Sequence, residues 1–222
     1  MAITLKILAK MDYFTGLTLD EIGEVKKLIA FEKRIEKGEM LLFEGERSEY
    51  IYFIVSGAVK VYKKSANGKE QILNVATGGD SLNDVSTFDG GGSAANMLVM
   101  TPVRLYAVKM KDIEKLFYEN PKIARNVARV LASRVRRDSS LVEVLSFGQV
   151  ISRLARLILK QSATLGETRL PHFTQQDMAA MVGTSRVVVN RSLRAMEEKG
   201  AIRLERRRIV ITDEPALRSL VR

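Results

Sequence analysis

The sequence predicts an α+β chain with an N-terminal roll of short β-strands, one long helix, and a small C-terminal domain of helices and a two-stranded ribbon. Turn residues recur between apolar segments over residues 31–110. Neither Gly nor Pro interrupts residues 122–147, and two short helical patterns flank Gly183–Thr184. These observations place the roll in residues 1–119, the long helix in 120–147 and the C-terminal domain in 148–222.

The front half reads as strands that alternate with turns. Turn signals stand at Gly38, Gly45, Gly57, Asn67–Gly68 and Gly78–Gly79. The expected strands are Met40–Phe43, Tyr50–Val55, Ala58–Tyr62, Ile72–Val75 and Val103–Val108. Asn67–Gly68 is the strongest hairpin signal, because a type I′ turn needs positive φ at both central residues. Many short strands with regular turns predict a sandwich or a barrel-like roll, which often holds a small ligand.

A long helix is expected next. Asn120 suits the N-cap and Pro121 the first helical position. At 1.5 Å per residue the helix would span about 40 Å. Heptad-like spacing predicts a coiled-coil dimer interface made by Val127, Leu131, Leu141 and Leu145. The alternative is a helix that packs against its own roll.

Two short helices then follow. Thr174 and Asp177 have the spacing of a capping box, Gly183 ends the first helix, and Ser185 caps the second. The second helix runs to about Lys199 and has an inward stripe of Val189, Leu193 and Met196. Its outward stripe is Arg186, Val187, Asn190, Arg191 and Arg194. Arg and Asn on the free face of such a helix are what reading a DNA major groove requires.

A basic ribbon completes the domain. Ile202–Glu205 and Arg208–Ile211 read as strands joined by a short connection. Adjacent arginines at its tip suit contact with phosphates. The alternative is a solvated turn on an ordinary small domain. The predicted DNA-contacting residues are Thr174, Gln175, Ser185, Arg186, Val187, Asn190, Arg191, Arg206, Arg207 and Arg208.

Charge and composition narrow the function. The 222 residues carry a formal net charge of +10. Residues 148–222 hold 14 Lys and Arg against 7 Asp and Glu, so this third carries most of the excess and suggests a polyanion partner. The absence of Cys excludes disulfides, thiolate zinc sites and iron–sulfur clusters. The single His, His172, cannot form a structural metal site, and a haem is not expected.

Enzymatic and membrane roles have little support. A dioxygenase on a similar roll would need several His and carboxylate ligands. With one His and no Cys, the common Ser/His and Cys/His hydrolases have little support. The longest uncharged run, Gly90–Val103, is too short to cross a membrane, and no signal peptide is visible. We therefore expect a cytoplasmic protein that is not an enzyme.

Several segments together resemble the CRP/FNR family of bacterial transcription regulators over nearly the whole chain. They are Lys37–Glu39, Glu44–Glu46, Ile51–Val61, Gly79–Asp80, Phe147 with Val150–Ala155, and Gly183–Arg186 with Arg191. The resemblance implies a homodimer with a cyclic-nucleotide-binding-type β roll (jelly roll), a long dimerisation helix and a C-terminal winged helix-turn-helix. It also implies double-stranded DNA as partner, RNA polymerase as a possible second partner, and a small effector in the roll.

The effector loop departs from the family pattern. Asp84 stands where cAMP-binding members carry a Glu for the ribose hydroxyl, and Gly92 stands where they carry an Arg for the phosphate. Backbone N–H groups of Gly91, Gly92 and Ser93 remain available in principle for an anion. By position in the family, the effector-facing residues are Asp84, Gly91, Gly92, Ser93, Ala94, Arg134, Asp138 and Ser139. We expect an unknown effector other than cAMP, or activity without ligand. The alternative is a cAMP- or cGMP-responsive regulatory protein.

The second short helix of the C-terminal domain also departs from the family pattern. Val187 stands where the family often has a Glu that accepts from cytosine. Val cannot accept a hydrogen bond but can contact a thymine methyl group, whereas Arg186 and Arg191 suit guanine and Asn190 suits adenine or phosphate. A palindromic operator that differs at one base pair of each half-site is therefore predicted.

Overall fold

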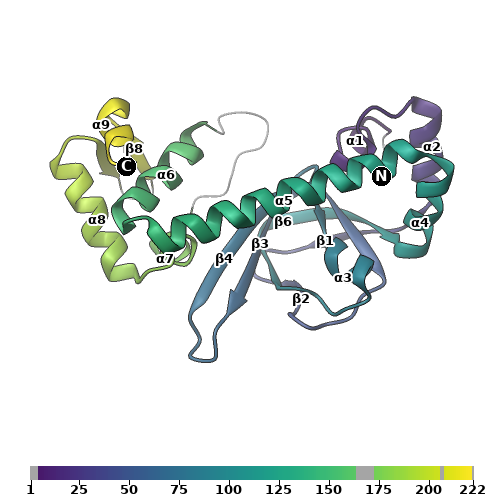
Figure 1. Ribbon diagram of the computed structural model, residues 1–222, viewed down its shortest axis with the longest axis horizontal. Coiled ribbons are helices and arrows are strands. Elements are labelled where there is room, and N and C mark those ends of the chain that lie inside the picture. Colours follow the sequence, from purple (N-terminus) through teal and green to yellow (C-terminus); the bar gives the residue numbers. More distant parts are fainter. Residues whose placement is uncertain (1–4, 164–172, 206–207, 222) are drawn as a thin grey trace. The chain divides into compact units, whose positions relative to one another are not determined.

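The computed structural model describes residues 5–163, 173–205 and 208–221 (Figure 1). The chain divides into two compact units, each with its own contacts. The first comprises Met1–Lys63 and Asn74–Arg136, and the second Lys64–Leu73 and Arg137–Arg222. The division falls inside the long helix α5, Pro121–Phe147.

Short helices precede the roll. They are α1 (Leu5–Leu8), η1 (Asp12–Phe14) and α2 (Leu19–Lys27). Thr18 caps α2, since its side chain accepts from the backbone N–H of Glu21 while the Glu21 carboxylate accepts from that of Thr18. Tyr13 and Phe14 of η1 are fully buried, so this segment belongs to the core of the first unit.

Six strands form the sheet of the roll. They are β1 (Ile29–Ile35), β2 (Met40–Leu42), β3 (Tyr50–Lys64), β4 (Glu70–Thr77), β5 (Ser81–Leu82) and β6 (Asn96–Lys109). The main order is β1-β6-β3-β4, with β2 beside β6 and β5 beside β3. Strand β6 runs antiparallel to β1, β2 and β3. The predicted β roll is confirmed.

Both faces of the central strands are buried, which explains their continuous apolar runs. Ile51 and Phe53 of β3 lie in a cluster with η1, α2, α4 and the start of α5. Tyr52 and Ile54, one residue out of phase, lie in a second cluster with residues from the other strands. This alternation follows from the two-residue period of a strand.

Two turns differ from the sequence prediction. Gly57 does not separate two strands but lies within β3, at φ 92°. A Cβ there would lie 2.3 Å from the Pro102 carbonyl oxygen, so close approach of the neighbouring strand requires Gly. At the Asn67–Gly68 turn, Gly68 has positive φ but Asn67 does not. The turn is therefore not type I′ but a longer loop, closed by the bond from Ser65 N–H to the Lys69 carbonyl.

Helices follow the roll. The short α3 (Asp84–Asp89) lies between β5 and β6, and α4 (Met110–Glu119) leads into α5. Asn120 caps α5 as predicted, because its side-chain oxygen accepts from the backbone N–H of Lys122 at 3.2 Å. The second unit adds α6 (Val150–Ala163), α7 (Gln175–Val182), α8 (Arg186–Glu198), β7 (Ile202–Glu205), β8 (Arg208–Ile211) and α9 (Glu214–Ser219). None of the helices described is long and apolar enough to cross a membrane.

The long helix has two apolar sides. Val127 is 5% exposed and lies in the roll's own core, so its prediction as a dimer contact is wrong. Leu131 packs against the same cluster. Leu145 lies beside Gly183 within the second unit, and Leu141 is half-buried. A different stripe is exposed at heptad spacing: Ala128, Ala132, Val135, Ser139, Val142 and Ser146.

Candidate nucleic-acid interface and effector pocket

Local signals build the two-helix element. The Thr174 hydroxyl accepts from the Asp177 N–H at 3.1 Å, and the Asp177 carboxylate accepts from the Thr174 N–H at 3.0 Å. Gly183 ends α7 at φ 68°, and the Ser185 hydroxyl accepts from the Val188 N–H to cap α8. The capping box, the Gly turn and the second cap are confirmed as predicted.

The inner face of α8 anchors the helix. Val189, Leu193 and Met196 are fully buried, and α8 packs on α6 and α7. The inward stripe predicted from the sequence is therefore confirmed. Because helix position is set by this apolar face, the opposite face is presented in a fixed orientation.

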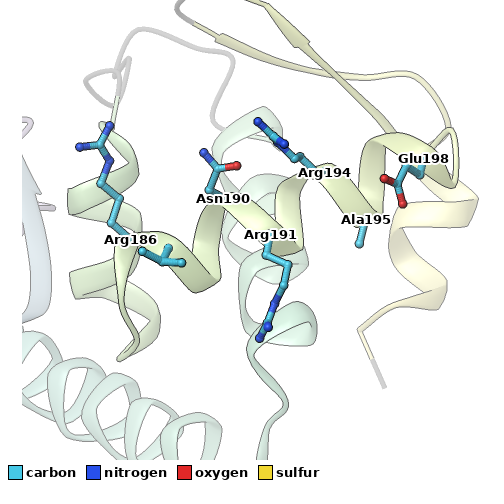
Figure 2. Close-up of a pocket in the computed structure, with 7 residues that line it drawn as sticks. Arg186, Asn190, Arg191, Arg194, Ala195 and Glu198 are labelled. Atoms are coloured by element: carbon cyan, nitrogen blue, oxygen red, sulfur yellow. The ribbon is translucent and has the colours of Figure 1, made fainter.

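The outer face of α8 lines an open groove of about 660 Å³. Its lining residues are Arg186, Val187, Asn190, Arg191, Arg194, Ala195 and Glu198. In Figure 2, Arg186, Asn190 and Arg194 project to one side of the helix and Arg191 to the other. Within the described chain, no carboxylate pairs with Arg186, Arg191 or Arg194. Their charge is available to an external anion.

Two of the lining residues lay outside the predicted outward stripe, and Arg194, which belongs to that stripe, was not among the predicted DNA contacts. Ala195 and Glu198 extend the outward stripe by one turn, and continuing the helical spacing beyond Arg191 and Arg194 would have found them. Val187, which was predicted, is 77% exposed. A large apolar side chain held in solvent on a basic face suits contact with a base methyl group.

The first helix contributes at its N-terminus. Gln175 accepts from the Asn190 side-chain amide at 3.5 Å, which links the start of α7 to the outer face of α8. The Thr174 hydroxyl is used in the cap, and Thr174 remains exposed. The structure thus brings Gln175 and Asn190 together.

The ribbon carries its own ion pairs. Glu205 accepts from Arg208 at 2.6 Å and from Arg203 at 3.1 Å. The Arg208 hydrogen bond, with the Arg203 bond and both charges, lowers the pKa of Glu205 below its usual value. Such exposed pairs are weak, so Arg208 can exchange Glu205 for a phosphate. Arg206, Arg207 and His172 lie outside the described residues.

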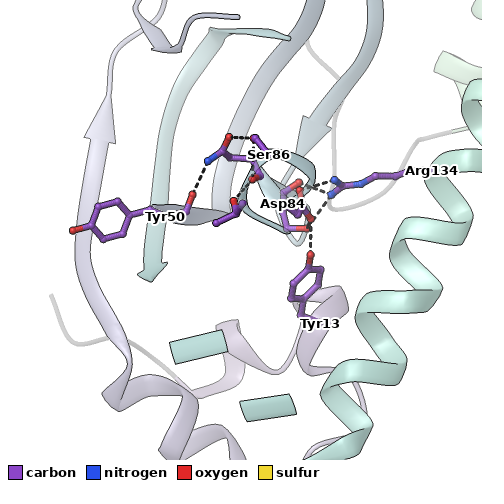
Figure 3. A network of polar contacts seen from close by, with 8 residues as sticks. Tyr13, Tyr50, Asp84, Ser86 and Arg134 are labelled. Atoms are coloured by element: carbon purple, nitrogen blue, oxygen red, sulfur yellow. Dashed lines mark hydrogen bonds and ion pairs between the residues drawn. The ribbon is translucent and has the colours of Figure 1, made fainter. Parts of the chain in front are cut away.

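In the roll, Asp84 is engaged by the protein itself (Figure 3). One carboxylate oxygen accepts from Arg134 Nη1 at 2.6 Å. The other accepts from the Tyr13 hydroxyl and the Ser81 hydroxyl, each at 2.6 Å. The Asp84 side chain is 0% exposed and that of Arg134 is 25% exposed. Asp84 therefore serves as an internal acceptor.

The network is ionic. Burial disfavours the charge of Asp84, but the charge and hydrogen bond of Arg134, with the bonds from Ser81 and Tyr13, hold its pKa below the usual value. Burial and then the Asp84 charge raise the pKa of Tyr13, so its hydroxyl stays protonated and donates. Burial opposes the charge of Arg134, but Asp84 raises its pKa overall.

The residue before Asp84 fixes the loop. Asn83 has φ 67° and is the one non-Gly residue with positive φ in the described ranges. Its side-chain amide donates to the Tyr50 carbonyl at 2.9 Å, and its side-chain oxygen accepts from the Ser86 hydroxyl at 2.5 Å (Figure 3). These bonds hold a conformation that Asn tolerates better than most residues.

Two backbone N–H groups of the glycine loop already have acceptors within the protein. The Gly91 N–H donates to the Asp89 carboxylate at 2.8 Å, and the Ser93 N–H donates to the Glu46 carbonyl at 2.8 Å. The prediction that Gly91 and Ser93 offer these groups to an anion is therefore wrong for this structure. Of the other predicted effector residues, Ala94, Asp138 and Ser139 are exposed. Asp138 and Ser139 belong to the second unit.

Restoring an Arg at position 92 is expected to damage the roll. A Cβ at Gly92 would lie 2.3 Å from the Gly45 carbonyl oxygen, and backbone cannot rotate away. Gly92→Arg should lower the free energy of unfolding by about 1–3 kcal/mol and create no cAMP response. Denaturation with and without cAMP checks this, with Ala94→Arg at a neighbouring exposed position as control. Unchanged stability together with a rise on adding cAMP would contradict it.

No group of three or more His, Cys, Asp and Glu side chains in the described ranges could hold a metal ion. Among the described residues, polar side chains gather on the outer face of α8 and around Asp84. The first suits recognition of an anionic surface with hydrogen-bonding edges. The Asp84 network suits holding separate segments of the first unit together.

Two family models match the chain. The model of a cyclic nucleotide-binding domain matches residues 32–120, and the model of a Crp-like helix-turn-helix domain matches residues 152–220. The matches cover the roll and the domain that carries α8.

Similar proteins cover nearly the full length. The CRP-like cAMP-activated global transcriptional regulator of Mycobacterium tuberculosis is 29% identical over 218 residues, 96% of this chain and 97% of that protein. The cyclic AMP receptor protein of Thermus thermophilus is 29% identical over 192 residues, 86% of this chain and 88% of that protein. The solved structure of FixK2 from Bradyrhizobium japonicum has a TM-score of 0.76 at 25% identity, covering 87% of this chain and 98% of that one.

Proposed function

Because the chain belongs to the CRP/FNR family and is a DNA-binding transcription regulator of that type, we propose that it binds a palindromic operator as a homodimer. The observation that carries the proposal is the outer face of α8, where Arg186, Arg191 and Arg194 line an open groove without a carboxylate partner among the described residues. Such a face fits the major groove, and two copies fit two half-sites.

Each residue of this face has a distinct role. Arg186 and Arg191 have the donor geometry to bond guanine O6 and N7, and Asn190 suits adenine. Val187 contributes an apolar contact to a thymine methyl group. Arg208 of the ribbon, with Arg206 and Arg207, binds phosphates and adds affinity without sequence preference.

Val187→Glu should change the operator at one base pair in each half-site. A carboxylate accepts from a cytosine amino group, whereas Val prefers a methyl group. Binding-site selection with both proteins compares the two consensus sequences directly. If the variant selects the wild-type consensus, Val187 does not contact a base.

The exposed stripe of α5 supports the dimer. Val135 and Val142 are 65% and 64% exposed and lie seven residues apart, as the seam of a coiled coil requires. This stripe, unlike the side that carries Val127, lies outside the buried cluster of the roll. A second copy of the chain packed along it would bury both valines.

Val135→Glu should raise the dimer dissociation constant about a hundredfold, because apposed like charges cost several kcal/mol. Sedimentation velocity across protein concentrations measures this. Ser133→Glu is the matched control, since Ser133 is also exposed but lies off the stripe. Equal behaviour of the two variants would exclude this stripe as the seam.

Two alternatives are considered for the effector: a cyclic nucleotide, or another small molecule or none. The match of residues 32–120 to a cyclic nucleotide-binding domain favours a cAMP- or cGMP-responsive protein. The enclosed Asp84 and the closed glycine loop favour another effector or none. Calorimetric titration with cAMP and cGMP separates them, because a responsive roll must bind one of the two. Contact with RNA polymerase remains a prediction.

Selection from random duplex DNA tests the proposed function. A palindromic consensus with two half-sites about one helical turn apart is the expected result. Binding without any consensus, weakened uniformly by salt, would reduce the protein to a non-specific DNA binder.

A further inference from the structure

Four separate segments of the first unit meet at Asp84. Tyr13 comes from η1, Ser81 from β5, Asp84 from the start of α3, and Arg134 from α5. Arg134 also donates from Nη2 to the Ser81 carbonyl at 2.6 Å and to the Ser81 hydroxyl at 2.9 Å. We call these four residues the Asp84 clamp. Nothing in the local sequence links Tyr13 to Asp84, which are 71 residues apart.

The clamp is closed to solvent at its centre. The Asp84 side chain is 0% exposed, and both its oxygens accept hydrogen bonds. An effector hydroxyl would have to displace a donor and enter a site with no exposed carboxylate surface. A ligand gains little there, because each new bond replaces an existing charge-assisted one.

The clamp fixes the long helix at a critical point. Earlier on α5, Ile123 and Val127 lie in the core, and the Asn126 side chain donates to the Tyr13 and Thr15 carbonyls. Arg134 is two turns farther along and directly precedes Val135 of the exposed stripe. The clamp therefore sets the rotation of α5 about its axis, and with it the direction of the stripe offered to a second copy.

We propose that the Asp84 clamp takes the place of a small effector, so that this regulator reaches its DNA-binding arrangement without ligand. An effector acts only by binding one arrangement better than another. Here the protein's own Arg134 joins α5 to Asp84 and Ser81, and Tyr13 joins the N-terminal segment to the same carboxylate. Tyr13, Ser81, Asp84 and Arg134 are positioning residues in this scheme, which rests on the proposed function.

The test uses full-length protein freed of small molecules by unfolding, extensive washing and refolding. Its affinity for the selected operator is measured by fluorescence anisotropy, before and after stripping, and with millimolar cAMP. We expect the same affinity in all three cases, within about twofold. A requirement for cAMP, or for a small-molecule fraction of a cell extract, would overturn the proposal.

Three variants distinguish a positioning role of the clamp in DNA binding from an effect on stability alone. Tyr13→Phe keeps the ring but removes one donor to Asp84, and should weaken operator binding about tenfold, within the range usual for coupling between sites. Asn126→Ala removes the bonds to the Tyr13 and Thr15 carbonyls but none of the bonds to Asp84. It should lower the melting temperature at least as much yet leave operator affinity unchanged while folded. Arg125→Ala, which removes an exposed charge from the same helix, should change neither.

The outcomes distinguish the two proposals. If operator affinity follows melting temperature across Tyr13→Phe and Asn126→Ala, the clamp is structural only and the inference fails. If Tyr13→Phe binds the operator like the wild type, the inference also fails. If no duplex is preferred by stripped, unstripped or cAMP-treated protein, the proposed function itself fails.

Discussion

Arg134→Ala should lower the free energy of unfolding of the first unit by about 3–5 kcal/mol. The variant leaves the Asp84 carboxylate, 0% exposed, without its cationic partner. A buried charge that loses its partner is far more costly than a surface pair, which contributes at most about 1 kcal/mol. Urea denaturation of the two proteins at pH 7 gives the difference. Arg136→Ala removes an exposed charge two residues away and should change stability by at most about 0.5 kcal/mol.

The pH dependence gives this prediction a second check. The folded pKa of Asp84 lies below its usual value because Arg134 and the hydroxyl donors outweigh burial. The contribution of ionised Asp84 to the free energy of unfolding is therefore complete above the unfolded pKa, about 3.9. It is lost as the pH falls through the lower folded pKa. Without Arg134, burial is opposed only by the Tyr13 and Ser81 donors, so the pKa of Asp84 should rise and the variant is penalised at neutral pH. The stability difference should shrink toward about pH 4; a difference that is constant with pH would contradict an ionic clamp.

Arg186→Ala should weaken binding to the selected operator by about 5- to 150-fold, since a bidentate Arg–guanine pair contributes about 1–3 kcal/mol of discrimination. The loss should be accompanied by relaxed preference at one base pair of each half-site. Fluorescence anisotropy with the operator and with single-base variants of it measures both effects. Arg186 lies at the start of α8, on the groove-lining face, where base contacts in this class of module are made.

Arg218→Ala is the matched control, because it removes the same charge from α9 of the same domain, where Arg218 pairs with Glu214. Its operator affinity should stay within about twofold of wild type. Should Arg186→Ala weaken the operator and a scrambled duplex equally, Arg186 contacts phosphate only. An unchanged operator affinity would remove it from the interface.

The DNA module was predictable because its signals are local. Thr174 and Asp177 form the capping box three residues apart, Gly183 ends α7, and Ser185 caps α8. The direction of each face of α8 follows from the helical period alone. A short helix whose apolar stripe is continuous has only one way to be buried, so the exposed residues followed from the buried ones.

The long helix shows where local reasoning fails. Its length and cap were predictable, but it has two apolar stripes, one with Val127 and one with Val135. The predicted seam followed only the first stripe, and periodicity does not say which of the two packs on the roll. The deciding contacts come from η1 and α2, far away in the sequence.

The Asp84 network shows the same limit. The resemblance placed Asp84 and Arg134 near one pocket, and the structure joins them by an ion pair. The resemblance did not reveal Tyr13, whose hydroxyl donates to Asp84 from the N-terminal segment. Whether a carboxylate faces a ligand or its own protein depends on such distant donors. A single sequence carries no spacing rule for them.

We expect this protein to recognise a specific DNA sequence without a ligand. The most direct test is the ratio of dissociation constants for a scrambled duplex and the selected operator, measured with stripped protein at about 150 mM salt. We expect a ratio of about 1,000 or more, the range of specific regulators. A ratio near one that rises only when a small molecule is added would contradict it.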